Sequence, residues 1–504
     1  MSTETELKLH ITPEQLARLN RHALLKSLSV SRPVTRRLHN IYYDTPKLEL
    51  HKTGMALRLR RAGNQWLQTL KGGGSVEAGV HRRSEWEVPV GSAKLDFTFS
   101  GVEEWDEFLP AALRGKLRPM FVTDFSRSTR MLDFHGARIE LCMDQGEVRA
   151  DELSVPICEI ELELKSGAVR SLFELASGLL DVVTFELEMV SKAERGYRLI
   201  TGFQERPVKA MVPDLAETET LDGVFRNLAW SCMQHMQANL QGAMHSDDVE
   251  YLHQVRVALR RLRVVLRMME KHRPDEKLSA LYREVSRLCI ALGRIREWDV
   301  FIEQTLQPIC ERMASHAGLQ GLLSASRKKQ QEGYAAMHSE NRVRELQSLV
   351  LRFAIWMNGD YWQQQSVTTI SVREFATTRL RRLAKRFRRS SEKLNTLDEA
   401  RLHALRILAK KLRYSAEFFS SLFDKHNSKV FLAALGEVQD VLGQINDIAV
   451  AQRLMEELAH DRKLSREVEA FLLVKGWIEH DLTDFFAVMH RAVERVSKAP
   501  VFWK

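Results

Sequence analysis

The sequence predicts two domains of different fold class. The N-terminal region is expected to be α+β, an eight-stranded antiparallel β-barrel with a polar interior and flanking helices. The C-terminal region is expected to be all-α, with two repeated helical bundles. Three observations predict this: charges at alternate positions in some eight short early segments, long amphipathic patterns later, and self-similarity at an offset of 150 residues. The expected boundaries are 1–205 for the barrel, 206–216 for a proline-containing linker and 217–498 for the helical domain.

The first expected strand carries Glu4, Glu6 and Lys8, which share one face because alternate residues of a strand point the same way. The alternation returns in later segments, which we expect to be strands: 39–45, 56–60, 66–71, 83–87, 124–127, 137–144 and 158–165. Helical patterns are expected from Thr12-Pro13-Glu14, over 100–120 and over 171–180. The glycines at 72–74 lack the ending of a P-loop, so residues 72–75 predict a flexible hairpin rather than a phosphate cradle.

Carboxylates and basic side chains are expected to face each other inside this barrel. Glu159, Glu161 and Glu163 would share one strand face and repel each other unless a cation lay between them. Closing the sheet places them opposite basic residues of other strands, namely Lys8, Arg58, Arg60, Lys71 and Arg83. Eight strands leave room inside for side chains and one small ligand. Such a lumen suits a compact anion held by Arg and Lys, together with Mg²⁺ or Mn²⁺ held by carboxylates.

The charge of the chain is unevenly distributed. Residues 1–205 carry 28 basic and 29 acidic side chains out of totals of 75 and 66, which leaves 47 and 37 for residues 206–504. The second part therefore holds the excess positive charge, which indicates a polyanionic partner. Five cysteines without CxxC spacing argue against a disulfide framework or a zinc site and indicate a reducing cytoplasm. No apolar run approaches a membrane span, and the charged N-terminus is not expected to be a secretory signal.

The repeat in the second part places basic residues on matching helix faces. Residues 252–256 match 402–406, residues 260–263 match 410–413, and Leu292-Gly293 matches Leu442-Gly443. In each copy the basic positions recur at steps of three and four, so they share one face of a helix. They are His253, Arg256, Arg260 and Arg263 in the first copy, and His403, Arg406, Lys410 and Arg413 in the second. Like charges on one face destabilise a helix, so a duplicated basic face predicts an anion-binding surface.

Residues 1–202 closely resemble the CYTH domain of the triphosphate tunnel metalloenzymes. The resemblance is carried by the ExExK motif at Glu4 to Lys8 and by further elements in the family's order, including Arg58-Leu59-Arg60 and Glu159 to Glu163. It implies hydrolysis or cyclisation of a triphosphate with a divalent metal. The residues that it implies for metal binding are Glu4, Glu6, Asp144, Glu159, Glu161 and Glu163, with Glu4, Glu6 and Lys8 in catalysis. Those that it implies for phosphate binding are Lys8, Arg58, Arg60, Lys71, Arg83, Arg127, Lys192 and Arg195.

The second part resembles the CHAD domain, a helical module associated with inorganic polyphosphate, and His253 and His403 match its namesake histidines. Asp299 has Ala449 at the equivalent position, so the two copies are not expected to bind symmetrically. The pair of domains resembles bacterial inorganic triphosphatases, which implies a metal-dependent hydrolase of tripolyphosphate with a polyphosphate-binding helical domain.

Two alternatives remain open from the sequence. One is a polyphosphate-binding or granule-associated protein with incidental hydrolysis, and the other is an organic triphosphate enzyme, either a thiamine triphosphatase or an adenylate cyclase. The basic stretches lack regularly interleaved aromatic residues and no DNA-binding motif appears, which argues against nucleic acid as the main partner.

Overall fold

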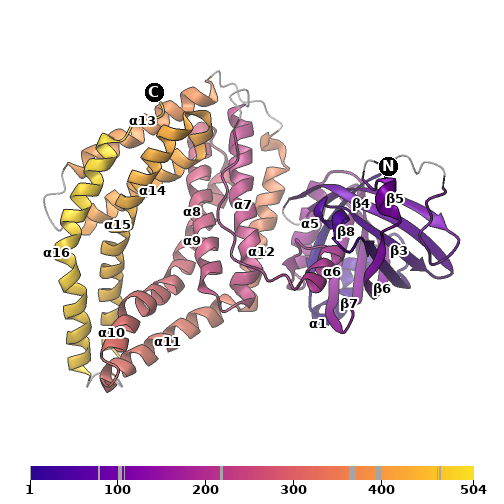
Figure 1. The fold of residues 1–504 in the computed structure, drawn as a ribbon, viewed down its shortest axis with the longest axis horizontal. Coiled ribbons are helices and arrows are strands. Elements are labelled where there is room, and N and C mark those ends of the chain that lie inside the picture. The colour runs from indigo at the N-terminus through magenta and orange to yellow at the C-terminus, as the bar shows by residue number, and fades with distance from the viewer. Residues whose placement is uncertain are drawn as a thin grey trace. The chain divides into compact units, whose positions relative to one another are not determined.

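The chain folds into two compact units in the computed structural model (Figure 1). The structure describes residues 2–77, 80–99, 105–106, 108–215, 220–362, 370–392, 399–461, 464 and 467–504. The first unit contains Met1–Arg206 together with Glu340–Gln363, and the second contains Pro207–Ser339 and Gln364–Lys504. The first unit therefore includes a segment that lies within the expected helical domain in the sequence.

The first unit is built on a closed antiparallel barrel of eight strands, as the sequence predicts. The order around the barrel is β1-β5-β4-β3-β2-β6-β7-β8, and β8 returns to β1. The strands are β1 (Ser2–His10), β2 (Val34–Asp44), β3 (Ala56–Ala62), β4 (Gln65–Glu77), β5 (Val80–Val90), β6 (Arg118–Phe134), β7 (Ala137–Ala150) and β8 (Leu153–Ser166). A two-residue strand, β9 (Glu186–Leu187), pairs with β1 at Leu9 and His10. Each of the eight described strands therefore pairs with a neighbour on both sides, and the alternation of side chains separates a charged lumen from an apolar outer face.

Helices cover parts of the apolar outer face. They are α1 (Pro13–Arg21), α2 (Ala23–Leu28), α3 (Glu49–Lys52), α4 (Ala111–Arg114) and α5 (Arg170–Leu180). Helix α6 (Lys192–Thr201) instead lies on the lumen side, where its Lys192 and Tyr197 pack on Phe125 and Phe121 of β6. Thr12 is the N-cap of α1, with Pro13 at its first turn, as the sequence predicts. The outer face of β1 is apolar, and its Leu7 and Leu9 are fully buried.

Two local predictions are wrong. Residues 72–75 are not a hairpin loop: β4 continues to Glu77, with an irregular register against β5 between Gly72 and Ser75. Such bulges use glycine where the backbone enters the left-handed region, and Gly73 has φ of +63°. Residues 100–120 are not one helix, because the described part contains only the four-residue α4 before β6 begins at Arg118. Residues 100–104 and 107 of that prediction lie outside the described residues.

The second unit is helical. Its helices are α7 (Leu221–His245), α8 (Val249–His272), α9 (Glu276–Val300), α10 (Gln307–Arg312), α11 (Ala317–Met337), α13 (Val372–Ser391), α14 (Glu399–Phe419), α15 (Lys425–Ala459) and α16 (Val468–Lys498). A π-helical turn (Phe301–Leu306) joins α9 to α10. The basic segments of the two copies lie on α8 and α14, which begin 150 positions apart and contact each other.

One helix of the sequence's second half, α12 (Glu340–Met357), belongs to the first unit and packs against α5. Among the described helices, none combines the length and apolarity that a membrane span needs. All five cysteines are free.

Candidate functional site: a charged lumen in the barrel

Three charged residues on the lumen side of β1 form part of the candidate site. Glu4, Glu6 and Lys8 all line one cavity of about 680 Å³, a volume typical of small-ligand sites. The Glu6 carboxylate lies 2.9 Å from the Lys8 ammonium, and Glu4 accepts a hydrogen bond of 2.6 Å from Lys71 on β4. Lys8 also pairs with Glu161, its direct neighbour in the β1–β8 register. This strand thus joins the acidic and basic walls of the lumen.

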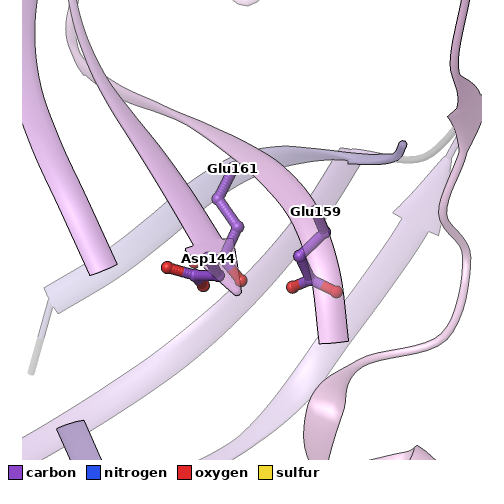
Figure 2. Close-up of side chains that lie close together, drawn as sticks. All are labelled: Asp144, Glu159 and Glu161. Atoms are coloured by element: carbon purple, nitrogen blue, oxygen red, sulfur yellow. The ribbon is translucent and has the colours of Figure 1, made fainter. Parts of the chain in front are cut away.

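Three carboxylates converge deeper in the barrel. Asp144 on β7 and Glu159 and Glu161 on β8 each offer an oxygen within 4.8 Å of the others, and all three residues are buried (Figure 2). Asp144 and Glu159 are direct register partners, and Glu161 follows on the same face of β8. Pairing between β7 and β8 therefore creates a cluster that neither segment reveals alone.

Cations from two other elements hold this cluster together. The Lys192 ammonium, at the start of α6, lies 2.6 Å from Asp144 and 2.9 Å from Glu161, and it also pairs with Glu159. Arg127 on β6 donates hydrogen bonds of 2.7 and 2.6 Å to the two oxygens of Asp144 and also bonds Glu161. Each buried carboxylate is therefore compensated, as buried charges must be.

These contacts set the ionisation of the cluster. Burial acts to raise the pKa of the Glu161 carboxyl, but Lys192, Lys8 and Arg127 outweigh burial and hold that pKa well below its usual range. Asp144 behaves similarly: Lys192 and Arg127 overcome its burial and lower its pKa. The Lys192 pKa is raised, because Asp144 and Glu161 outweigh the effect of its own burial. Asp144 and Glu161 are accordingly ionised at neutral pH.

The cluster fits a hard divalent cation in its chemistry. Its donors are carboxylate oxygens, the ligands that Mg²⁺ and Mn²⁺ prefer, and the group contains no thiol or imidazole for a softer metal. Asp144, Glu159 and Glu161 could hold such an ion, with Glu6 on the neighbouring wall. Glu163 lies apart from the three, pairing with Lys165 at 2.5 Å, and burial raises its pKa.

The opposite wall of the cavity carries the guanidinium groups of β3. Arg58 lies 3.4 Å from Glu85, whereas Arg60 donates a 2.9 Å hydrogen bond to the Asn40 amide oxygen. Burial, together with Arg58 and Arg127, lowers the pKa of Arg60 to about 10. Lys71 and Arg83 line the same cavity. Arg60 is thus a half-buried cation close to other cations, an environment that a bound anion would relieve.

Helix α6 brings Lys192 and Arg195 to the site. Ser191 caps the helix, and Arg195 pairs with Glu159. Gly196 lets the helix approach the barrel, since a Cβ there would lie 2.1 Å from the Phe121 ring. His51 on α3 adds a 2.9 Å contact to Glu194.

Further residues of the barrel have clear positions. Arg130, three positions after Arg127 on β6, donates to Asn20 and does not line the cavity. Lys165 pairs with Glu163 and Glu140. Sequence reasoning missed Tyr42, which lines the cavity and is the register partner of Arg58. Its alternation with Asn40 along β2 could have revealed it.

The basic faces of the helical unit form a second candidate site. Arg256 and Arg260 on α8 and Arg406 and Lys410 on α14 act on one another electrostatically. Burial, followed by Arg260, Arg406 and Arg256, lowers the pKa of Lys410 to about 6. The Nε atoms of Arg260 and Arg406 are buried without a hydrogen-bond partner among the described residues. The structure therefore brings the matching basic positions of both copies together.

The two copies differ in detail. His253 is half-buried, and burial followed by the surrounding arginines lowers its pKa to about 4, whereas His403 is exposed. Arg413 is engaged by Glu417 at 2.8 Å and by Gln439 at 3.1 Å. Arg263 lies near Cys289 and Lys411. Sequence reasoning missed Arg296 on α9, which acts on His253 and bonds the buried Asp299 at 3.2 Å.

A barrel with this lumen, followed by paired basic helices, defines a two-domain protein of the class that the sequence resembles. The CYTH domain model matches residues 2–197, and the CHAD domain model matches residues 227–456. The chain therefore contains a CYTH domain followed by a CHAD domain, which confirms the resemblance.

Two curated relatives and one solved structure are similar to parts of this chain. An inorganic triphosphatase of Haemophilus influenzae is 35% identical over 201 residues, which is 40% of this chain and 55% of that protein. The chain thus spans about half the length of this relative. An uncharacterized protein of Mycobacterium tuberculosis is 24% identical over 439 residues, covering 82% of this chain and 81% of its own. The CHAD domain of the plant Ricinus communis has a TM-score of 0.50 and 28% identity, covering 58% of this chain and 97% of that chain.

Proposed function

We propose that the barrel hydrolyses inorganic tripolyphosphate to pyrophosphate and phosphate with a divalent metal, Mg²⁺ or Mn²⁺. One observation carries the proposal: the cavity that Glu161 of the carboxylate cluster lines also contains Arg60, a cation whose side chain bonds the neutral Asn40 amide. The inorganic triphosphatase of H. influenzae, similar over this region, supports the same activity.

The chain's own residues would position the substrate. Arg58, Arg60 and Lys71 present donors that suit phosphate oxygens, and Arg forks bind such oxygens in pairs. Glu4 and Glu6 offer acceptor oxygens that would orient a water molecule for attack on the terminal phosphorus. A bound divalent ion would be held by the carboxylates and would neutralise charge that develops on the phosphates. Positioning and neutralisation suffice for this reaction, so no enzyme nucleophile is expected.

The substrate assignment is tested by phosphate release from tripolyphosphate, ATP and thiamine triphosphate, each with Mg²⁺ and with chelator. We expect the fastest turnover on tripolyphosphate and its loss with EDTA. Faster turnover of ATP, or formation of cyclic AMP, would refute the inorganic substrate. Turnover that survives EDTA would refute the metal.

The phosphate-binding role is tested by Arg60→Met with Arg61→Met as its control. Arg61 is the next residue of β3, is exposed, and donates its Nε–H to the Gly63 carbonyl. Loss of a charge-assisted hydrogen bond costs about 1.5–3 kcal/mol, so KM for tripolyphosphate should rise roughly tenfold or more in the first variant only. Equal effects of the two substitutions would contradict the role.

We also propose that the helical unit binds inorganic polyphosphate through Arg256, Arg260, Arg406 and Lys410. Buried arginine nitrogens without hydrogen-bond partners support an anionic ligand there. In the full chain, Arg260→Met should weaken binding of long-chain polyphosphate and reduce its salt dependence. Arg283→Met, on the exposed side of α9, should not. Unchanged binding in Arg260→Met would overturn the assignment.

A further inference from the structure

Helix α12 is part of the barrel unit although the flanking sequence belongs to the helical unit. It follows α11 after two residues, His338 and Ser339, and packs on α5. Ten of its eighteen residues are buried, which for an isolated surface helix would be unusual. Its attachment therefore has to be explained by what it contacts in the barrel unit.

Residues near the N-terminus of α12 bond the segment that connects α5 to β9. Arg344 donates to the Leu180 carbonyl at 2.5 Å and to the Thr184 hydroxyl at 2.9 Å. Glu340 accepts from the same Thr184 hydroxyl at 2.6 Å and from Gln15 at 3.3 Å. These contacts fix the approach to β9 from both sides of Thr184.

The middle of α12 reaches β9 itself. The Leu187 backbone N–H donates a 3.1 Å hydrogen bond to the side-chain oxygen of Gln347, which is 2% exposed. Gln347 is the one polar residue among the ten buried residues of α12, and a buried amide is costly unless its polar atoms are satisfied, so this bond is a specific one. The next residue, Glu188, donates its N–H to the Lys8 carbonyl at 2.8 Å.

The same short segment leads directly into the site. His81 on β5 donates to the Glu188 carbonyl at 3.3 Å, and the Val190 N–H donates to the Glu188 side chain at 2.8 Å. Ser191 then caps α6, and Lys192 follows at the centre of the carboxylate cluster. Only four residues separate the Gln347-bonded Leu187 from Lys192, so the position of one constrains the position of the other.

We propose that α12 is a positioning element of the tunnel: Gln347 and Arg344 fix β9 and thereby place Lys192 among Asp144, Glu159 and Glu161. The barrel domain of residues 1–205 is then incomplete without a helix supplied from the second half of the sequence. The inference rests on the proposed function only in that Lys192 is taken to serve tripolyphosphate binding.

The test uses the full chain and three variants of α12. Gln347→Met keeps the size and removes the acceptor, Gln347→Glu keeps an acceptor, and Asn341→Met changes an exposed polar residue of the same helix. Hydrogen exchange of peptides covering residues 185–192 reports the segment without any need for turnover. Loss of one buried hydrogen bond should accelerate exchange there about tenfold in Gln347→Met, with recovery in Gln347→Glu and no change in Asn341→Met.

Binding of tripolyphosphate to the same variants, measured by calorimetry, completes the test. We expect affinity to fall about tenfold in Gln347→Met and to recover in Gln347→Glu. Unchanged exchange in residues 185–192, or faster exchange with unchanged affinity, would overturn the inference. A wild-type chain that neither binds nor hydrolyses tripolyphosphate would instead refute the proposed function, and the exchange data would still decide whether α12 fixes β9.

Discussion

Replacement of Glu161 by Gln tests the carboxylate cluster most directly. The substitution keeps the size of the side chain and removes its charge. Glu161 contacts Lys8, Arg127 and Lys192 in a setting where it is 7% exposed. We expect turnover of tripolyphosphate to be abolished, because the variant removes a carboxylate from the group that is proposed to hold the metal.

The effect on stability can be worked from the same contacts. Three cations attract Glu161 at contact distance, while the carboxylates of Asp144 and Glu159 repel it, so the balance is about one attractive pair. At an effective dielectric constant of about 20, one pair at about 4 Å is worth about 4 kcal/mol. Breaking one partner out of a buried ion pair costs about 3–5 kcal/mol, which agrees. We therefore expect Glu161→Gln to destabilise the barrel unit by about 3–5 kcal/mol at pH 7.

The sign of the pH dependence follows from the lowered pKa of Glu161. A carboxyl whose pKa is lower in the folded state stabilises that state above its unfolded pKa, here near 4.5, and loses the contribution as pH falls toward the folded value. The difference between wild type and Glu161→Gln should accordingly be full at pH 7 and shrink below pH 4.5.

The assay must report the barrel alone, because a chain of two units need not unfold in one step. Urea titrations at each pH, followed by a short hydrogen-exchange pulse at one common pH, give the unfolding of β7 and β8 from their peptides. A destabilisation below 1 kcal/mol at pH 7, or one that is the same at pH 4 and pH 7, would refute the reasoning about the cluster. Retained turnover would remove Glu161 from the metal site.

Two further predictions concern α6 and the helical unit. Gly196→Ala should destabilise the barrel by about 1–3 kcal/mol and impair turnover, because the new Cβ would overlap the Phe121 ring. Gly178→Ala on α5 is the control: its Cβ meets nothing within 4 Å, so it should leave stability unchanged or raise it. Urea unfolding compares the two variants, and equal effects would contradict the packing argument. Polyphosphate binding should weaken as pH rises above about 6, by up to about tenfold per pH unit, because the polyanion favours protonated Lys410. In binding titrations, Lys410→Arg should lose this dependence of affinity on pH. An identical dependence in both proteins would exclude Lys410 as its source.

The features of the barrel that could be predicted are those that depend on the residue pattern within a single strand. Alternation along residues 3–10 and 158–165 places Lys8 and Glu161 on lumen faces, and the structure then makes them register partners. Binary alternation determines which face a side chain takes, but it does not determine which strands are neighbours. The convergence of Asp144 with Glu159 depends on the register of β7 against β8, so the resemblance was needed to name these residues together.

Other features could not be predicted because their causes are not local. The glycines at 72–74 read as a loop from their composition, yet pairing with β5 carries the strand through them. Residues 340–357 have a helical pattern like that of their neighbours, and only tertiary packing assigns α12 to the barrel unit. The repeat predicts matching basic faces, but burial of His253 and exposure of His403 depend on what covers each helix.

The pairing of charges within the lumen links the two expected ligands. The ammonium group of Lys192 pairs with Asp144 and Glu161, so a metal ion held by these carboxylates would compete with the ammonium for them. A buried ammonium without a partner is unfavourable, and phosphate oxygens would supply one. The same exchange applies to Lys8, which pairs with Glu6 and Glu161 on the strand that opens the site. Metal and tripolyphosphate should therefore favour each other's binding, since each provides the charge partner that the other displaces.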